Sequence, residues 1–205
     1  MNLVIGSGDT TALLSGKNTQ GFASLIQKFV ANDKPYYNAF ASPINALRTG
    51  AILESKYLEI LSDDYFFQWK ETADTFDCLV SSIDFAKIEN GKIVDFDELK
   101  TIYLTEYIDI ILPLKKLEYN NQIEVLKKKF KSNYNQVQFQ LLCSGLKEAN
   151  LVFLSVESYE DDENKLREIK ENDFTKFRIK RDELVIGKIM ERSTIFQTLK
   201  NNILC

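Results

Sequence analysis

The sequence predicts an α/β protein in which α-helices flank a mixed central β-sheet. Segments with apolar residues at every second position, typical of strands, are interspersed with segments that repeat at helical spacing. The 205 residues are 44% hydrophobic and 12% aromatic, enough to bury a sizeable core without disulfides or a structural metal. There is no internal repeat or low-complexity linker and there are only three prolines, so we expect residues 1–205 to form a single domain.

Hydrophobic periodicity places the individual elements along the chain. Residues 105–119 fit a strand, a helix or a lid equally well. The charged stretch 161–173 predicts an exposed turn and a short helix. Elsewhere the pattern predicts helices at about 8–15, 20–31, 43–61, 120–145 and 187–202, and strands near 65–70, 76–88, 92–104, 150–157 and 176–181.

Composition excludes several classes of site. The chain has no histidine, which removes histidine-based triads, histidine–metal nuclease motifs and zinc sites that need histidine. The cysteines Cys78, Cys143 and Cys205 lack the spacing of metal ligands, which argues against an iron–sulfur cluster, and we expect Cys78 and Cys143 to be core residues. No apolar run approaches the roughly 20 residues of a membrane span and no signal-peptide pattern is present, so we expect a cytoplasmic protein.

The most informative segment is 84–100, which reads DFAKIENGKIVDFDELK. Alternating residues on both sides of Asn90 and Gly91 predict two antiparallel strands. We expect a three-residue loop of Glu89, Asn90 and Gly91, which puts glycine where the backbone needs a positive φ. The length of this loop decides which side chains of the hairpin share a face.

With a three-residue loop, Asp84 lies opposite Phe96, and Glu98 and Lys100 point to the same face as Asp84. A two-residue turn would put them on the other face. Two carboxylates can hold Mg²⁺ through oxygen while a lysine offsets charge on a reacting phosphate, as a metal-dependent phosphodiesterase requires. The same spacing also occurs on solvated hairpin faces, so the motif alone leaves both interpretations open.

A third carboxylate lies on the helix predicted at 43–61. Arg48, Gly50 and Glu54 fall near the middle of this helix. Glycine inside a helix costs about 1 kcal/mol relative to alanine, so Gly50 indicates close approach of another backbone or of a ligand. Glu54 is therefore a candidate metal ligand from a separate element.

Four stretches share their order and spacing with one nuclease family. IGSGDTTALL (5–14) is similar to that family's Ile-Gly-x-Ser-Asp opening, with Ser7 and Gly8 in swapped order. LRTGAILESKYLEIL (47–61) has its Arg-x-Gly-x-x-x-Glu pattern, and SSIDFAKIENGKIVDFDELKT (81–101) has its Asp followed by Glu-x-Lys. NYNQVQFQLLCSGLKEANLVFLSV (133–156) resembles its Tyr-x-Gln-Val-Gln helix and the strand that follows, and 177–199 resembles its closing strand and helix. Together they resemble the lambda-exonuclease (YqaJ-type) viral recombinase branch of the PD-(D/E)xK nucleases.

The resemblance implies a restriction-endonuclease-like core and a Mg²⁺- or Mn²⁺-dependent DNA exonuclease. Glu54, Asp84 and Glu98 would hold the metal, with the Leu99 carbonyl as a further ligand and Lys100 beside the attacking water. The flanking helix would bring Gln136 to the site and Gln138 to the DNA. Because Gln136, Gln138 and Gln140 have a spacing of two, they cannot share one helix face, and we expect about half of them to be solvated. Further DNA contacts are implied for Arg48 and, at a helix N-terminus, for Ser7 or Gly8.

An alternative register aligns YIDIILPL (107–114) with the family's acidic-x-Lys strand. Asp109 would then take the acidic position and Ile111 the lysine position, and the lysine would be lost. We favour Glu98 and Lys100, because that register keeps all three residue types and the hairpin explains their convergence. The Glu98/Lys100 register predicts that Asp109 is exposed or paired with a lysine, away from the site. The alternative register places Asp109 beside Glu54 and Asp84.

The distribution of charge bears on DNA binding. The net charge of −4 opposes a nonspecific DNA binder, and the family's phosphate-binding arginine ahead of the Ile-Gly motif has no counterpart here. Acidic residues concentrate late in the chain, between 161 and 171. Local potential sets phosphate contact, so a basic run can still form a duplex track or can be a solvated helix face. That run comprises Lys127, Lys128, Lys129 and Lys131, with Lys115 and Lys116 upstream.

Two functions are compatible with these features. The first is a deoxyribonuclease that acts on double-stranded DNA ends in phage-type recombination. By resemblance it would be a ring-like homo-oligomer in the host cytoplasm, with a single-strand annealing protein as a possible partner. The second is a nuclease fold that has lost catalysis and binds DNA ends or proteins.

Overall fold

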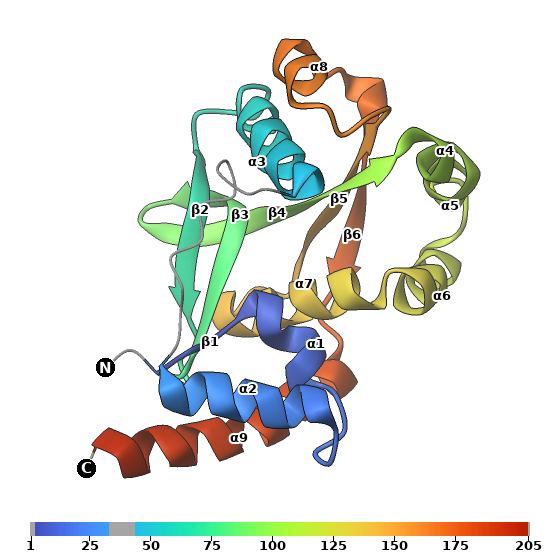
Figure 1. Ribbon diagram of the computed structural model, residues 1–205. Coiled ribbons are helices and arrows are strands. Elements are labelled where there is room, and N and C mark those ends of the chain that lie inside the picture. The colour runs from blue at the N-terminus through green and yellow to red at the C-terminus, as the bar shows by residue number, and fades with distance from the viewer. Residues whose placement is uncertain (1–2, 33–43, 205) are drawn as a thin grey trace.

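The computed structural model describes residues 3–32 and 44–204, and the centre of this part is a six-stranded mixed sheet (Figure 1). The strand order is β1-β3-β4-β5-β6, and β2 pairs with the free edge of β3. β1 and β3 are parallel, as are β4 and β5, whereas the other neighbours are antiparallel. The expected α/β class with a mixed sheet is therefore confirmed. The strands are β1 (Ile5–Gly6), β2 (Tyr65–Thr72), β3 (Leu79–Glu89), β4 (Lys92–Tyr103), β5 (Glu148–Val156) and β6 (Phe174–Lys180).

Helices cover both faces of this sheet (Figure 1). α3 and α8 lie together over one face, and α7 packs against the other. Behind α7 lies a second layer formed by α1, α2 and α9. The longer helices are α2 (Gln20–Ala31), α3 (Asn45–Leu58), α6 (Tyr119–Lys129), α7 (Lys131–Ser144) and α9 (Glu183–Leu204), and α1 (Thr10–Leu13) and α8 (Asp161–Leu166) are short.

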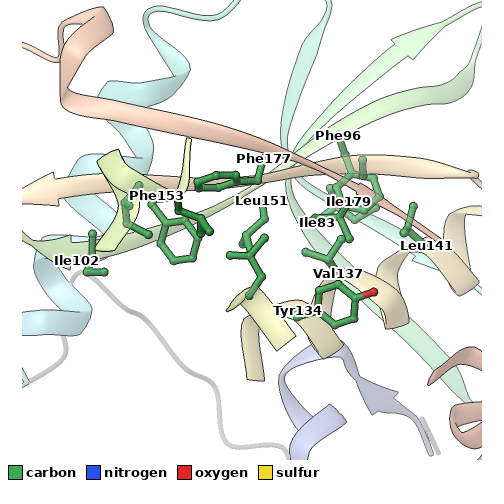
Figure 2. Packing of buried hydrophobic residues seen from close by; sticks show 14 of the residues in the cluster. Ile83, Phe96, Ile102, Tyr134, Val137, Leu141, Leu151, Phe153, Phe177 and Ile179 are labelled. Atoms are coloured by element: carbon green, nitrogen blue, oxygen red, sulfur yellow. The ribbon is translucent and has the colours of Figure 1, made fainter. Parts of the chain in front are cut away.

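Apolar side chains bury α7 on both of its sides. Figure 2 shows Val137 and Leu141 of α7 in the largest core cluster, together with Leu151 and Ile179 of the sheet. On the opposite side, Phe139 belongs to a second cluster with α2 and α9, where Phe196 makes edge-to-face contacts. A helix enclosed in this way has little freedom to shift, so α7 is a rigid support for polar side chains that face the sheet.

The single helix expected at 120–145 is two helices. The backbone at Phe130 leaves helical geometry (φ −119°, ψ 39°), which separates α6 from α7. The Phe130 ring packs on Phe153 of β5, with ring centroids 4.7 Å apart. The break therefore lets this aromatic side chain join the core at the end of the helix.

The segment 105–119 is largely helical. It contains α4 (Leu104–Glu106), a π-helical stretch (Tyr107–Ile111) and α5 (Leu112–Leu114). Together with α6 and α7 it forms the crossover that joins β4 to its parallel neighbour β5, a connection that cannot be a tight hairpin. No helix within residues 3–32 and 44–204 is both long and apolar enough to cross a bilayer.

Further predictions concern the cysteines, the start of the helix at residue 43, and Gly50. Cys78 and Cys143 are buried and free, as predicted, while Cys205 lies outside the described residues, as does residue 43 of the helix predicted at 43–61. Of the two alternatives for Gly50, the close approach of another backbone is wrong: among the described residues, nothing lies within 4 Å of the position that a Cβ would take there. The space beside Gly50 is open, so the close approach of a ligand there stays a prediction.

Candidate active site at a fork in the sheet

The sheet forks at β3. One edge of β3 pairs with β2 over most of its length. The other edge pairs with β1 at Leu79 and Val80 and with β4 only from Phe85 onward. Asp84 therefore lies where β3 leaves β4, and its carboxylate replaces the missing main-chain partner: the Leu99 amide donates to Asp84 Oδ2 at 2.9 Å.

The turn of the β3–β4 hairpin is shorter than predicted. Glu89 pairs with Lys92, so the turn has two residues, Asn90 and Gly91, and both have positive φ (52° and 74°). The expected three-residue loop is wrong, and this turn alone would put Glu98 and Asp84 on opposite faces.

A β-bulge restores the side-chain pattern. The register shifts between Lys87 and Ile88, so that Phe85 pairs with Asp97 instead of with an even-numbered neighbour. A bulge adds one residue to one strand and thereby exchanges the faces beyond it. Continuing this register, Asp84 faces Glu98 across the fork, and the predicted convergence is reached by a short turn together with a bulge.

Glu98 is the centre of the site. Its side chain is completely buried. Lys100 Nζ and Gln136 Nε2 both donate to Glu98 Oε1 at 2.5 Å, and Gln140 Nε2 donates to Glu98 Oε2. Gln136 and Gln140 are four residues apart, so they lie on the same face of α7. A buried carboxylate needs such partners, because an unpaired charge away from water is strongly destabilising.

Glu54 completes the acidic group from α3. Burial raises the pKa of Glu54 to about 7, with a further contribution from the charge of Glu98, although Lys100 opposes the shift. Burial and then the charge of Glu98 also raise the pKa of Asp84 well above its usual value. Burial favours the neutral form of Lys100, but Glu98 and then Asp84 outweigh it and raise its pKa. Lys100 therefore stays protonated and pairs with Glu98, while Glu54 and Asp84 hold their protons to higher pH than ordinary carboxyl groups.

These donors suit a hard divalent cation. They are carboxyl oxygens, the ligand type that Mg²⁺ and Mn²⁺ prefer, and a cation would displace the protons that burial favours on Glu54 and Asp84. In addition, the buried Gln140 Oε1 has no hydrogen-bond partner within the described chain. Among the residues that the structure describes, no three carboxylates or other ligand side chains are already close enough to form a cage. Glu98 would have to exchange some of its present partners for a cation.

A separate polar network supports α3 against β4. The buried Asp97, next to Glu98, accepts hydrogen bonds from Tyr57 Oη (2.8 Å), Lys176 Nζ (2.6 Å) and Asn150 Nδ2 (2.7 Å). Tyr57 lies three residues after Glu54 on α3, so this network fixes the helix that carries Glu54. No sequence motif pointed to Asp97 or Tyr57, and Gln140 was not assigned to the site; the only sequence signal for Gln140 is its spacing of four from Gln136.

Three further predictions concern Gln138, the solvation of the glutamines and the position of Asp109. Gln138 is fully buried; it donates to the Lys180 carbonyl and accepts from the Asp182 amide, so the expectation that it contacts DNA was wrong. The expectation that about half of the three glutamines are solvated was wrong as well, because Gln138 and Gln140 are fully buried and Gln136 is half-buried and bonded to Glu98. Asp109 is exposed on the π-helical stretch, as the Glu98/Lys100 register requires.

Of the residues expected to contact DNA away from the site, Arg48 and Lys127 form ion pairs with carboxylates, and the other lysines are exposed at the surface. Arg48 pairs with Asp161 of α8 at 2.8 Å. Lys127 pairs with Asp182 at 2.6 Å and lies over the Tyr134 ring. Lys128, Lys129 and Lys131 are exposed at the junction of α6 and α7.

Ser7 lies in a pocket beside the fork. The pocket has a volume of about 330 Å³ and is lined by Ser7, Gly8, Lys70 and Ser82, among others. Ser7 Oγ donates to the Ser82 carbonyl at 3.4 Å. Ser82 precedes Asp84 by two residues, so this pocket adjoins the acidic group. Lys70 supplies the positive charge of this pocket, and no sequence motif had pointed to it.

Two exonucleases of known structure have a similar fold. The alkaline exonuclease LHK-Exo of Laribacter hongkongensis superposes with a TM-score of 0.62 at 12% identity, over 99% of this chain and 92% of that chain. The phage-related exonuclease of Haemophilus somnus 129PT superposes with a TM-score of 0.60 at 15% identity, over 100% and 96%. The chain has the fold of these exonucleases. LHK-Exo has also been crystallised with dAMP, and that structure superposes with a TM-score of 0.60 at 14% identity, over 99% of this chain and 92% of that chain.

Sequence comparison alone detects no relative. No protein-family model matches the chain, and no curated protein sequence matches it significantly. The exonuclease fold is therefore preserved at a level of identity where the similarity is visible in three dimensions and in short motifs only.

Proposed function

We propose that the protein is a divalent-metal-dependent deoxyribonuclease that acts on the ends of duplex DNA. The observation that carries the proposal is the fork of an exonuclease fold, where Asp84 lies opposite Glu98, Glu98 pairs with Lys100, and the charges of Glu98 and Lys100 act on Glu54. Fold alone does not imply activity, but an acidic group of this composition suits phosphodiester hydrolysis.

Each residue has a role in that reaction. Glu54, Asp84 and Glu98, with the Leu99 carbonyl, would hold Mg²⁺ or Mn²⁺, which when bound lowers the pKa of water and neutralises phosphate charge. Lys100 remains protonated and stabilises the negative charge that develops on the phosphate oxygens as water attacks phosphorus. Gln136 orients the Glu98 carboxylate.

Two surfaces would contact the DNA backbone. The pocket beside the fork offers hydroxyl groups and the Lys70 ammonium to a phosphate. Lys128, Lys129 and Lys131 would contact phosphates farther along the duplex. The dAMP complex of LHK-Exo supports nucleotide binding by this fold. By the same resemblance we propose a homo-oligomer and a single-strand annealing partner, which light scattering and co-purification would test.

The test is digestion of linear, nicked and single-stranded DNA by purified protein with Mg²⁺ or Mn²⁺. We expect nucleotide release from linear duplex, which Asp84→Asn, Glu98→Gln and Lys100→Met abolish while the proteins stay folded. Asp109→Asn is the matched control: it removes an exposed carboxylate of the rejected register and should leave activity unchanged. If the wild-type protein digests none of these substrates, the proposal fails and a catalytically inactive end-binding module becomes the better description.

A further inference from the structure

Gln140 bridges the two strands of the fork. Its Nε2 donates to Glu98 Oε2 on β4 and, at 3.0 Å, to the Ser82 carbonyl on β3. The main-chain ladder between β3 and β4 has ended by this point. One side chain from α7 therefore ties together the two strands that carry Asp84 and Glu98.

The orientation of this amide is fixed by chemistry. Both of its contacts, a carboxylate and a main-chain carbonyl, can only accept hydrogen bonds, so the NH₂ group must face them. The reversed amide would set oxygen against two oxygens. Both hydrogens of Nε2 are used, and the remaining atom, Oε1, is an acceptor.

Gln140 Oε1 is buried and accepts no hydrogen bond from any residue that the structure describes. Buried polar atoms in folded proteins nearly always have a partner, so an acceptor without one indicates a donor that the chain itself does not supply. The neighbouring glutamine of the same helix, Gln138, differs in this respect, because both of its amide atoms are satisfied by main chain.

We propose that Gln140 is a positioning residue of the metal site. Its amide nitrogen holds Glu98 beside β3, and its carbonyl oxygen accepts a hydrogen bond from water that hydrates the bound divalent cation. This inference rests on the proposed function, and it names a residue that acts through Glu98 and through solvent. Groups that orient metal ligands in this way typically change metal affinity about 10- to 100-fold when they are removed.

The experiment measures Mn²⁺ binding to the full chain without DNA, by the paramagnetic resonance signal of free Mn²⁺, together with the melting temperature. Gln140→Met keeps the side-chain volume and removes both polar functions. Gln138→Met is the matched control, since it removes the hydrogen bonds of an equally buried glutamine on the same helix. We expect both variants to melt at a lower temperature, but only Q140M to bind Mn²⁺ about 10- to 100-fold more weakly.

Equal Mn²⁺ affinity in Q140M and the wild type would overturn the inference and leave the metal site standing. If Q140M does not fold, Gln140→Asn replaces it: the shorter side chain keeps an amide in the core but cannot span the fork, and unchanged affinity in Q140N would be equally decisive against the inference. A wild-type protein that binds no Mn²⁺ would instead overturn the metal site, and with it both proposals.

Discussion

Glu54 should destabilise the metal-free protein at neutral and alkaline pH. Its pKa is raised from 4.5 to about 7, chiefly by burial. The folded state therefore binds the proton more tightly than the unfolded state. Stability is highest below the unfolded pKa near 4.5 and is lost as the pH rises through 7. One pKa unit corresponds to about 1.4 kcal/mol, so the full loss is about 3 kcal/mol.

Replacing Glu54 with glutamine removes this loss, because the amide resembles the protonated acid and does not ionise. At pH 8 without metal we expect E54Q to be more stable than the wild type by up to about 3 kcal/mol, or about 6–12 °C in melting temperature for a chain of this length. At pH 4.5 the difference should disappear. With Mg²⁺ or Mn²⁺ present the order should reverse, since a cation stabilises the state that binds it.

The assay is thermal unfolding followed by circular dichroism from pH 4.5 to 8, with and without metal. Glu124→Gln, at an exposed position of α6, is the control for the change in net charge. If E54Q is no more stable than the wild type at pH 8 in the absence of metal, burial does not disfavour the ionised Glu54 carboxylate as the structure indicates, and the reasoning about the metal site is refuted.

Two further predictions concern DNA contact and the support behind the site. Changing Lys128, Lys129 and Lys131 to glutamine should flatten the dependence of log affinity on log salt by up to about 0.9 per lost phosphate contact. Binding isotherms at several salt concentrations measure this; an equal effect from glutamine at the exposed Lys92, Lys147 and Lys170 would mean that net charge alone matters. Tyr57→Phe keeps the ring contacts with Phe85 and Phe174 but loses the hydrogen bond to Asp97, so it should cost about 1.5–3 kcal/mol in denaturant unfolding. Tyr103→Phe, at a tyrosine that is 51% exposed, should be neutral, and a neutral Y57F would show that the network does not hold α3.

Sequence patterns were enough to predict the class of the fold and to propose the residues of the acidic group. Periodicity located the main strands and helices because apolar faces recur at fixed spacing in both structures. The carboxylates and the lysine were recognisable because they lie in short motifs, Glu54 on one helix and Asp84, Glu98 and Lys100 on one hairpin. The preference for Glu98 over Asp109 also came from the sequence, and the exposure of Asp109 agrees with it.

How these residues come together depends on contacts between distant parts of the chain. The bulge that corrects the two-residue turn is a local shift of register with no clear sequence signal, and it decides which face Glu98 takes. The three glutamines of α7 have different partners because this helix is buried on both sides. Gln138 forms hydrogen bonds with main-chain groups, whereas Gln136 and Gln140 form them with Glu98. The Tyr57–Asp97–Lys176 network joins residues 40 and 79 positions apart. Such contacts depend on packing between distant segments, and packing of that kind is set by the whole fold.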